Sequence, residues 1–151
     1  MPEDYYQFME TALKEAERGF DRGEVPVGAV LVSADNEIVA CAHNQPVNLN
    51  EPAAHAEILV LREAGKHLGN YRLLDTTLIV TIEPCIMCMG AALNARILRL
   101  VFGAPDPKWG ACGSLYNLAE DNRLNHRIEV IPGIMEKECR ELIQKFFQLR
   151  R

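Results

Sequence analysis

The chain of 151 residues carries 16 Lys and Arg against 21 Asp and Glu, a formal net charge of −5. This length suits one domain with a substantial core, and the acidic balance argues against a protein that coats nucleic acid through bulk charge, although a local basic patch is allowed. No apolar run approaches the roughly 18 residues of a membrane span, and the polar start at residues 1–4 is unlike a signal peptide, so we expect a cytoplasmic protein that contacts no membrane.

The first half of the chain predicts a helix, a strand pair and a second helix. Apolar residues recur at three- and four-residue spacing over 4–19, which indicates an amphipathic helix. Two β-branched runs, 27–32 and 37–42, are separated by a turn-rich insert of hairpin length, so we expect antiparallel strands. After a loop broken by prolines, a helix is expected over 53–67.

Asn44 lies in the loop between the second strand and this second helix. A loop at this place is well suited to contact a substrate, and the amide of Asn44 could bind a base by hydrogen bonds. Asparagine is also typical of turns. From the residues alone, both roles stay open.

The second half of the chain predicts strands that alternate with helices. The run 78–82 is nearly all apolar, as expected for a strand covered on both faces. A helix from about Pro84 to Ala95 separates it from a strand at 98–103, and this order predicts parallel pairing through a right-handed crossover. A loop over 104–114, a short helix over 115–120, a fifth strand over 127–131 and a last helix over 136–150 complete the chain.

These elements predict an α/β fold. We expect three layers, α/β/α, in which a mixed five-stranded sheet carries helices on both faces. No linker, repeat or low-complexity segment interrupts the chain, so residues 1–151 are expected to form one domain. Side chains at the junction between the strand at 78–82 and the helix after it would then lie at the carboxyl end of the parallel strands. Ligands of α/β proteins usually bind there.

Two short motifs carry the chemistry. Cys85 and Cys88 follow Pro84 and stand three residues apart, which places both thiols on one side of a helical turn. His55 offers a third donor, and one imidazole with two thiolates is a zinc-binding set that leaves one tetrahedral position for water. Glu57 can converge on the same point if both helices begin at the metal, because first-turn side chains lean toward the helix N-terminus.

This H-x-E…P-C-x-x-C pattern is a known signature of zinc-dependent nucleobase deaminases. In that chemistry zinc acidifies its bound water, and a glutamate that is not a ligand carries protons, which is the role predicted for Glu57. The alternative is a structural zinc, which needs a fourth ligand. Cys41, Cys112 and Cys139 are available, but none has metal-ligand spacing to another candidate.

The chain resembles the bacterial tRNA-specific adenosine deaminases over almost its whole length. The matching segments are 23–30, 42–44, 54–57, 81–88, 102–104, 125–127 and 146–147, followed by the terminal arginines. The metal motif alone fits any member of the cytidine/deoxycytidylate deaminase superfamily, whereas the flanking segments favour this branch. The resemblance implies a cytidine-deaminase-like fold, one Zn2+ per subunit, a homodimer, and hydrolytic conversion of the wobble adenosine in a tRNA anticodon arm to inosine, with no DNA partner expected.

The same resemblance implies roles for residues outside the metal motif. Asn44 and Ala56 are assigned to substrate binding, Asp106 and Lys108 to a loop around the anticodon, and Phe147, Arg150 and Arg151 to RNA contact. Gln45, where an arginine is frequent, and Trp109 depart from the pattern. Trp109 could lie on the surface or, beside Lys108, offer a plane for stacking.

Other functions fit parts of this pattern. A guanine, cytosine or nucleoside deaminase would use the same zinc chemistry but would not need a basic, aromatic C-terminus. An RNA-binding module with a structural zinc would not need Glu57. Arg150 and Arg151 could also simply end a helix, as basic residues often do, but Phe147 lies off the apolar stripe of that helix, which favours RNA contact.

Overall fold

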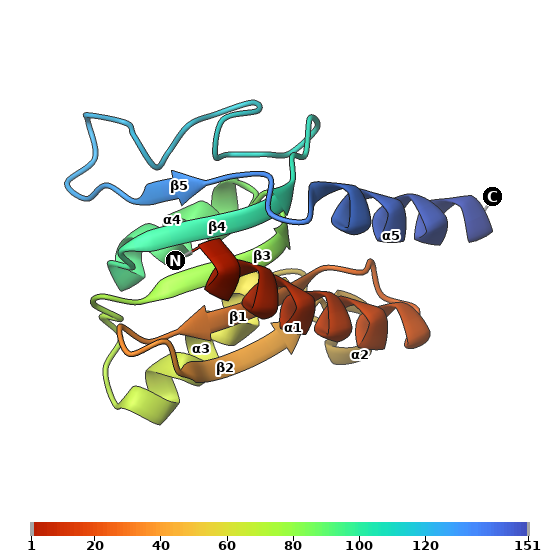
Figure 1. Cartoon of the computed structure of the whole chain (residues 1–151), viewed down its shortest axis with the longest axis horizontal. Coiled ribbons are helices and arrows are strands. Elements are labelled where there is room, and N and C mark those ends of the chain that lie inside the picture. The colour runs from red at the N-terminus through yellow and green to blue at the C-terminus, as the bar shows by residue number, and fades with distance from the viewer. Residues whose placement is uncertain (1, 151) are drawn as a thin grey trace.

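The computed structural model describes residues 2–150, with side chains from Asp4 to Arg150, so the predicted RNA contact Arg151 lies outside the described residues. A five-stranded sheet in the order β2-β1-β3-β4-β5 forms its centre (Figure 1). The strands are β1 (Gly28–Val32), β2 (Ile38–His43), β3 (Thr77–Ile82), β4 (Arg99–Ala104) and β5 (Glu129–Ile131). The helices are α1 (Pro2–Asp21), α2 (Pro46–Leu49), α3 (Ala56–Leu68), α4 (Ile86–Ala95) and α5 (Glu136–Leu149).

The sheet is mixed, as the sequence predicts. Strand β1 pairs antiparallel with both β2 and β3, whereas β3, β4 and β5 are parallel to one another. Every residue of β1 and β3 is buried, because apolar side chains on both faces of these central strands are covered. The parallel pairing of β3 with β4 through α4 is therefore confirmed.

Helices cover both faces of the sheet. In Figure 1, α1 lies in front of the strands and α3 and α4 lie behind them, whereas α5 extends to the right of the strands. Helix α1 packs so closely on β1 that a Cβ added to Gly28 would lie 1.9 Å from the carbonyl oxygen of Ala12. The predicted three-layer α/β/α arrangement is confirmed. Between residues 2 and 150, none of the helices has both the length and the apolarity that crossing a membrane requires.

The segment after β4 differs from the sequence prediction. The short helix expected over 115–120 is wrong: the chain reverses instead, with a bridge between Cys112 and Asn117. The Leu118 N–H donates to the carbonyl of Ala111 at 3.0 Å, which closes this reversal. Helix α2, which the sequence did not indicate, is a single turn in the loop that follows β2.

Candidate metal centre and active site

Three donor side chains meet at one point. The Nδ1 of His55 lies 3.4 Å from the Sγ of Cys88 and 3.6 Å from the Sγ of Cys85, and the three donor atoms all lie within 4.8 Å of one another. Tetrahedral zinc, with bonds of about 2.0 Å to nitrogen and 2.3 Å to sulfur, separates such ligands by about 3.5 Å. The donor set and its spacing therefore fit zinc.

The ends of two helices create this cluster. His55 is the N-cap residue of α3 and Cys85 is the N-cap residue of α4, both with extended backbone angles. Cys88 follows in the first turn of α4, where it is buried. Both helices thus begin at the cluster, with Cys85 instead of Pro84 as the last residue before α4. Their dipoles favour thiolate at this point.

The pKa values of the two thiols move in opposite directions. The pKa of Cys85 is lowered to about 4, because Cys88 and then His55 hydrogen bond to its thiolate. The pKa of Cys88 is raised by the same hydrogen bond to Cys85 and by burial. A cation bound at this cluster would replace the proton that Cys88 keeps, which is the behaviour of a metal site built from thiolates.

Glu57 lies in the first turn of α3 beside this cluster and outside its donor set. Its side chain is only 4% exposed. Burial raises the pKa of Glu57 to about 7, because removal of water disfavours the charged form. A carboxyl group that titrates near neutrality can both accept and donate a proton.

A cleft of about 880 Å³ connects the cluster with the loop after β4 and with α5. Its size is typical of a small-molecule site. Of the residues singled out in the sequence, it is lined by Asn44, His55, Glu57, Cys85, Asp106, Lys108, Trp109 and Phe147. The structure therefore brings together side chains from four distant parts of the chain.

Asn44 is buried between the cleft and the start of α3. Its Oδ1 accepts the N–H of Ala56 at 2.7 Å, which fixes the orientation of the amide, since only the oxygen can accept. The NH2 group is then the part of Asn44 that remains for a ligand. Ala56 is fully buried, and its N–H is occupied by Asn44.

The loop after β4 presents its longest side chains to solvent. The Oδ1 of Asp106 accepts the N–H groups of Lys108 at 3.0 Å and Trp109 at 3.2 Å, which makes a tight turn. Lys108 is exposed, and Trp109 is 69% exposed. An exposed indole beside an ammonium group suits contact with a nucleic acid.

The C-terminal end of α5 holds the remaining predicted contacts. Phe147 is 47% exposed and packs edge-to-face against Phe146. Arg150 donates to the carbonyl of Gly23 at 3.0 Å, and its guanidinium lies 4.3 Å from the centre of the Phe146 ring. Arg150 also lines a second hollow of about 730 Å³ together with Lys108 and Phe147.

Three polar residues of the cleft were not singled out in the sequence: Glu83, Arg140 and Gln144. Glu83 is 3% exposed and sits beneath the loop after β4. A sequence signal for it exists, because an acidic residue directly before Pro84 interrupts an apolar run. Nothing in the spacing of α5 points to Arg140 or Gln144, because they become part of the cleft only when the helix docks on the sheet.

Comparison with known proteins agrees with this site. The family model for the cytidine and deoxycytidylate deaminase zinc-binding region matches residues 2–104. A tRNA-specific adenosine deaminase from Streptococcus pyogenes serotype M18 is 46% identical over 146 residues, which is 97% of this chain and 91% of that protein.

Solved structures show the same likeness. One, from work on A-to-I editing by tRNA:A34 deaminases at the wobble position of transfer RNA, superposes with a TM-score of 0.87 at 45% identity, over 90% of this chain and 98% of that chain. A guanine deaminase from Nitrosomonas europaea has a TM-score of 0.82 at 23% identity, over 93% and 83% of the two chains, which is a likeness of fold alone.

Proposed function

Because the chain belongs to the cytidine and deoxycytidylate deaminase family, we propose that it hydrolyses the wobble adenosine of a tRNA anticodon to inosine and ammonia. One observation carries this proposal: the cleft that contains Glu57 continues to Lys108 and Phe147. A free base would not need an ammonium group and an exposed ring at the cleft mouth, whereas a polynucleotide would use both.

His55, Cys85 and Cys88 hold the zinc ion in this proposal, one ion per subunit. Zinc held there would lower the pKa of a bound water molecule and so supply the attacking oxygen at neutral pH. Glu57 accepts the proton that the water loses and delivers it to N1 of the adenine ring. As the oxygen of water becomes bonded to C6, the bond from C6 to the amino nitrogen breaks, and the second proton of the water, passed on by Glu57, lets that nitrogen leave as ammonia.

Asn44 holds the flipped base in this proposal, through the NH2 group that its bond to Ala56 leaves available. We expect Asn44→Asp, which keeps an acceptor for the Ala56 N–H but lacks the NH2 donor, to slow single turnover about tenfold or more while tRNA affinity changes little. Gln45→Ala, one residue along the same loop, is the matched control. An unchanged single-turnover rate in Asn44→Asp would show that Asn44 only caps α3.

Asp106, Lys108, Phe147, Arg150 and Arg151 contact the anticodon arm in this proposal. Replacing Arg150 and Arg151 with alanine is expected to lower tRNA affinity and to reduce the salt dependence of binding by about 0.7 for each lost contact to single-stranded RNA. Phe147→Ala is expected to weaken binding by about 1 to 3 kcal/mol without changing that salt dependence, because a stacked ring displaces no counterions. Fluorescence titrations of labelled tRNA over a range of salt concentrations measure both effects.

Lys137 provides the control for this tail experiment, because it is a strongly exposed base near the start of the same helix. Lys137→Ala should bind tRNA like the parent. Arg150→Ala alone should also lower the melting temperature slightly, since Arg150 bonds to Gly23. Binding by the alanine variants that matches the parent in affinity and salt dependence would assign the tail a structural role only.

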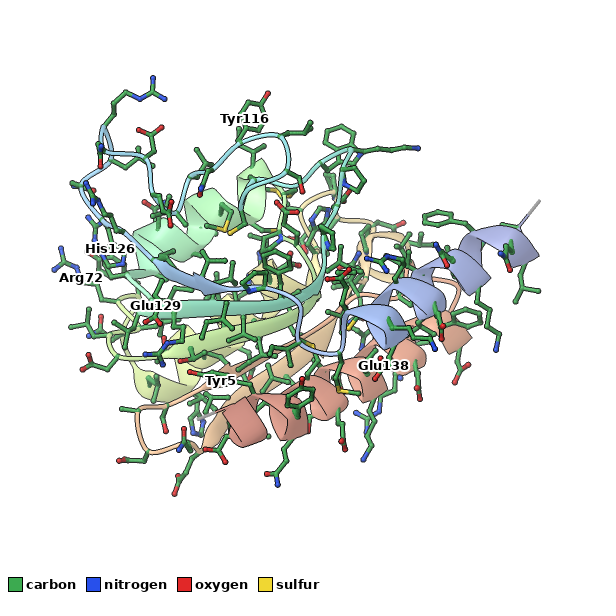
Figure 2. The ribbon with its side chains drawn as sticks, turned by 45° about the horizontal axis from the view of Figure 1, so that its top comes forward. Tyr5, Arg72, Tyr116, His126, Glu129 and Glu138 are labelled. Atoms are coloured by element: carbon green, nitrogen blue, oxygen red, sulfur yellow. The ribbon has the colours of Figure 1, made fainter. Side chains whose placement is uncertain are left out.

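Residues 1–151 act as one deaminase domain in this proposal, and two copies form a homodimer. Four apolar side chains near the start of α4 and on the adjacent loop are at least one-third exposed: Ile86, Met87, Leu115 and Tyr116. Figure 2 shows Tyr116 directed away from the sheet. Such a patch supports a surface for binding a second copy.

A tRNA substrate and five free cysteines support a cytoplasmic location, without DNA or membrane partners.

Turnover of four substrates tests this function. The parent is incubated with tRNA, free guanine, free cytosine and adenosine, and ammonia release is measured for each. The proposal requires release from tRNA alone at a substantial rate. Release from guanine or cytosine without release from tRNA would identify a free-base deaminase instead.

A further inference from the structure

We propose that Glu83 is a positioning residue that holds the substrate loop, defined here as residues 105–114, over the cleft. This inference rests on the proposed function, since it assigns a role in RNA binding to the same cleft. Glu83 immediately follows β3 and precedes Pro84 and the ligand Cys85. It is 3% exposed, although ionisable side chains are rarely buried without a specific arrangement of partners.

The carboxylate of Glu83 accepts hydrogen bonds from both ends of the substrate loop. Its Oε1 accepts the N–H of Asp106 at 3.0 Å, and its Oε2 accepts the N–H groups of Cys112 at 2.9 Å and Ser114 at 3.1 Å. The hydroxyl of Ser114 donates a further bond to Oε1. All four partners are donors, so an acceptor-only carboxylate satisfies them and a carboxamide cannot.

The loop also packs directly on Glu83. A Cβ added to Gly110 would lie 2.4 Å from the carboxyl carbon of Glu83, so the loop backbone passes over this side chain without a gap. The Ala111 N–H donates to the carbonyl of Pro84 at 2.8 Å, and Gly110 forms a bridge with Cys85. The loop is therefore aligned with the segment that carries a metal ligand.

The hydrogen bonds to Glu83 also position the side chains at the cleft mouth, because one of them holds Asp106. Glu83 fixes the backbone of Asp106, and the side chain of Asp106 in turn accepts the N–H groups of Lys108 and Trp109. Loss of the bond from Asp106 to Glu83 should therefore also release the bonds from Lys108 and Trp109 to the side chain of Asp106. The expected result is a mobile loop whose Lys108 and Trp109 must be ordered each time RNA binds, at a cost in affinity.

Glu83→Gln is the main test, with Trp109 as the reporter, because the chain contains one tryptophan. In the protein without RNA, we expect the fluorescence anisotropy of Trp109 to fall and the amides of Asp106, Cys112 and Ser114 to exchange faster. With tRNA, we expect KM to rise about tenfold, while kcat falls much less and zinc content stays unchanged. Ser114→Ala, which removes one donor, should also lower the anisotropy and raise KM, each by a smaller amount than in Glu83→Gln. This variant covers the case that Glu83→Gln does not fold.

Glu24 supplies a matched control, because it is a second buried carboxylate that binds loop amides. It is 1% exposed and accepts the N–H groups of Val47 at 3.2 Å and Asn48 at 2.8 Å, on the other loop of the cleft. Glu24→Gln should leave the anisotropy of Trp109 unchanged. Equal anisotropy in parent, Glu83→Gln and Ser114→Ala, or an equal fall in Glu24→Gln, would overturn the inference. A parent that does not act on tRNA would instead refute the proposed function, while the anisotropy still decides the role of Glu83.

Discussion

Replacing Glu57 with alanine is expected to abolish deamination while the protein keeps its zinc. Glu57 is buried beside the metal donors but outside their set, and its pKa of about 7 suits a group that passes protons in both directions. Loss of a general acid–base typically lowers a rate by about 10² to 10⁴. Glu57→Gln, which keeps the volume but cannot exchange protons, should lose activity to a similar degree. Rates with tRNA and zinc content by atomic absorption, measured on the same samples, check both parts.

Glu63 on the exposed side of α3 gives the control for this experiment. Glu63→Ala should keep both activity and zinc. If Glu57→Ala released zinc to the same degree as a substitution of Cys85, Glu57 would be a ligand and the assignment of the proton carrier would be wrong. A Glu57→Gln protein with parental turnover would also contradict the assignment.

Replacing Cys88 with alanine is expected to remove zinc, activity and part of the stability together. Cys88 is 1% exposed and lies 3.4 Å from His55, so no solvent-borne ligand can easily take its place. A bound ion stabilises the folded state by about 1.4 kcal/mol for each tenfold excess over its dissociation constant. A chelator should therefore lower the melting temperature of the parent and leave that of Cys88→Ala unchanged.

Cys112 is the matched control, because it is a buried thiol outside the donor set, in contact with Met89. Cys112→Ala should lose some stability through the small cavity that it creates but should keep its zinc and its response to chelator. Stoichiometric zinc in Cys88→Ala would contradict the proposed ligand set.

The sequence predicted the elements that local patterns determine. The apolar run of β3 and the proline and cysteines after it placed the strand, the start of α4 and the donor cluster to within about two residues, because hydrophobic period and helix-start preferences act over short distances. The sequence predicts that His55 and Cys85, 30 residues apart, bind the same metal ion, because metal binding restricts which residue types occur together.

The parts that the sequence did not predict depend on contacts between distant residues. Helix α2 is held by Glu24, which accepts the N–H groups of Val47 and Asn48 from more than 20 residues away. The expected helix over 115–120 is absent, because Glu83 binds the Ser114 amide and the chain then turns back on Ala111. Local patterns do not show which distant amides a buried carboxylate binds.

Arg150 illustrates the same limit at the C-terminus. A basic residue at the end of a helix is compatible with RNA contact or with a helix end, and its bond to the Gly23 carbonyl, 127 residues away, has no trace in local spacing. Docking of α5 on α1, through Phe146 against Phe20, places Phe147 at the cleft. The proposed RNA surface therefore depends on tertiary packing, whereas the metal site follows from two motifs.

Turnover of a tRNA in water labelled with oxygen-18 tests both the reaction and its site on the RNA. The tRNA carries adenosine at the wobble position and elsewhere in its anticodon loop, and the product is digested and read by mass spectrometry. We expect inosine at the wobble position alone, with one heavy oxygen on its base, in the parent and not in Glu57→Gln. Adenosine that remains intact at the wobble position, or inosine spread over the other adenosines of the loop, would contradict the proposed function.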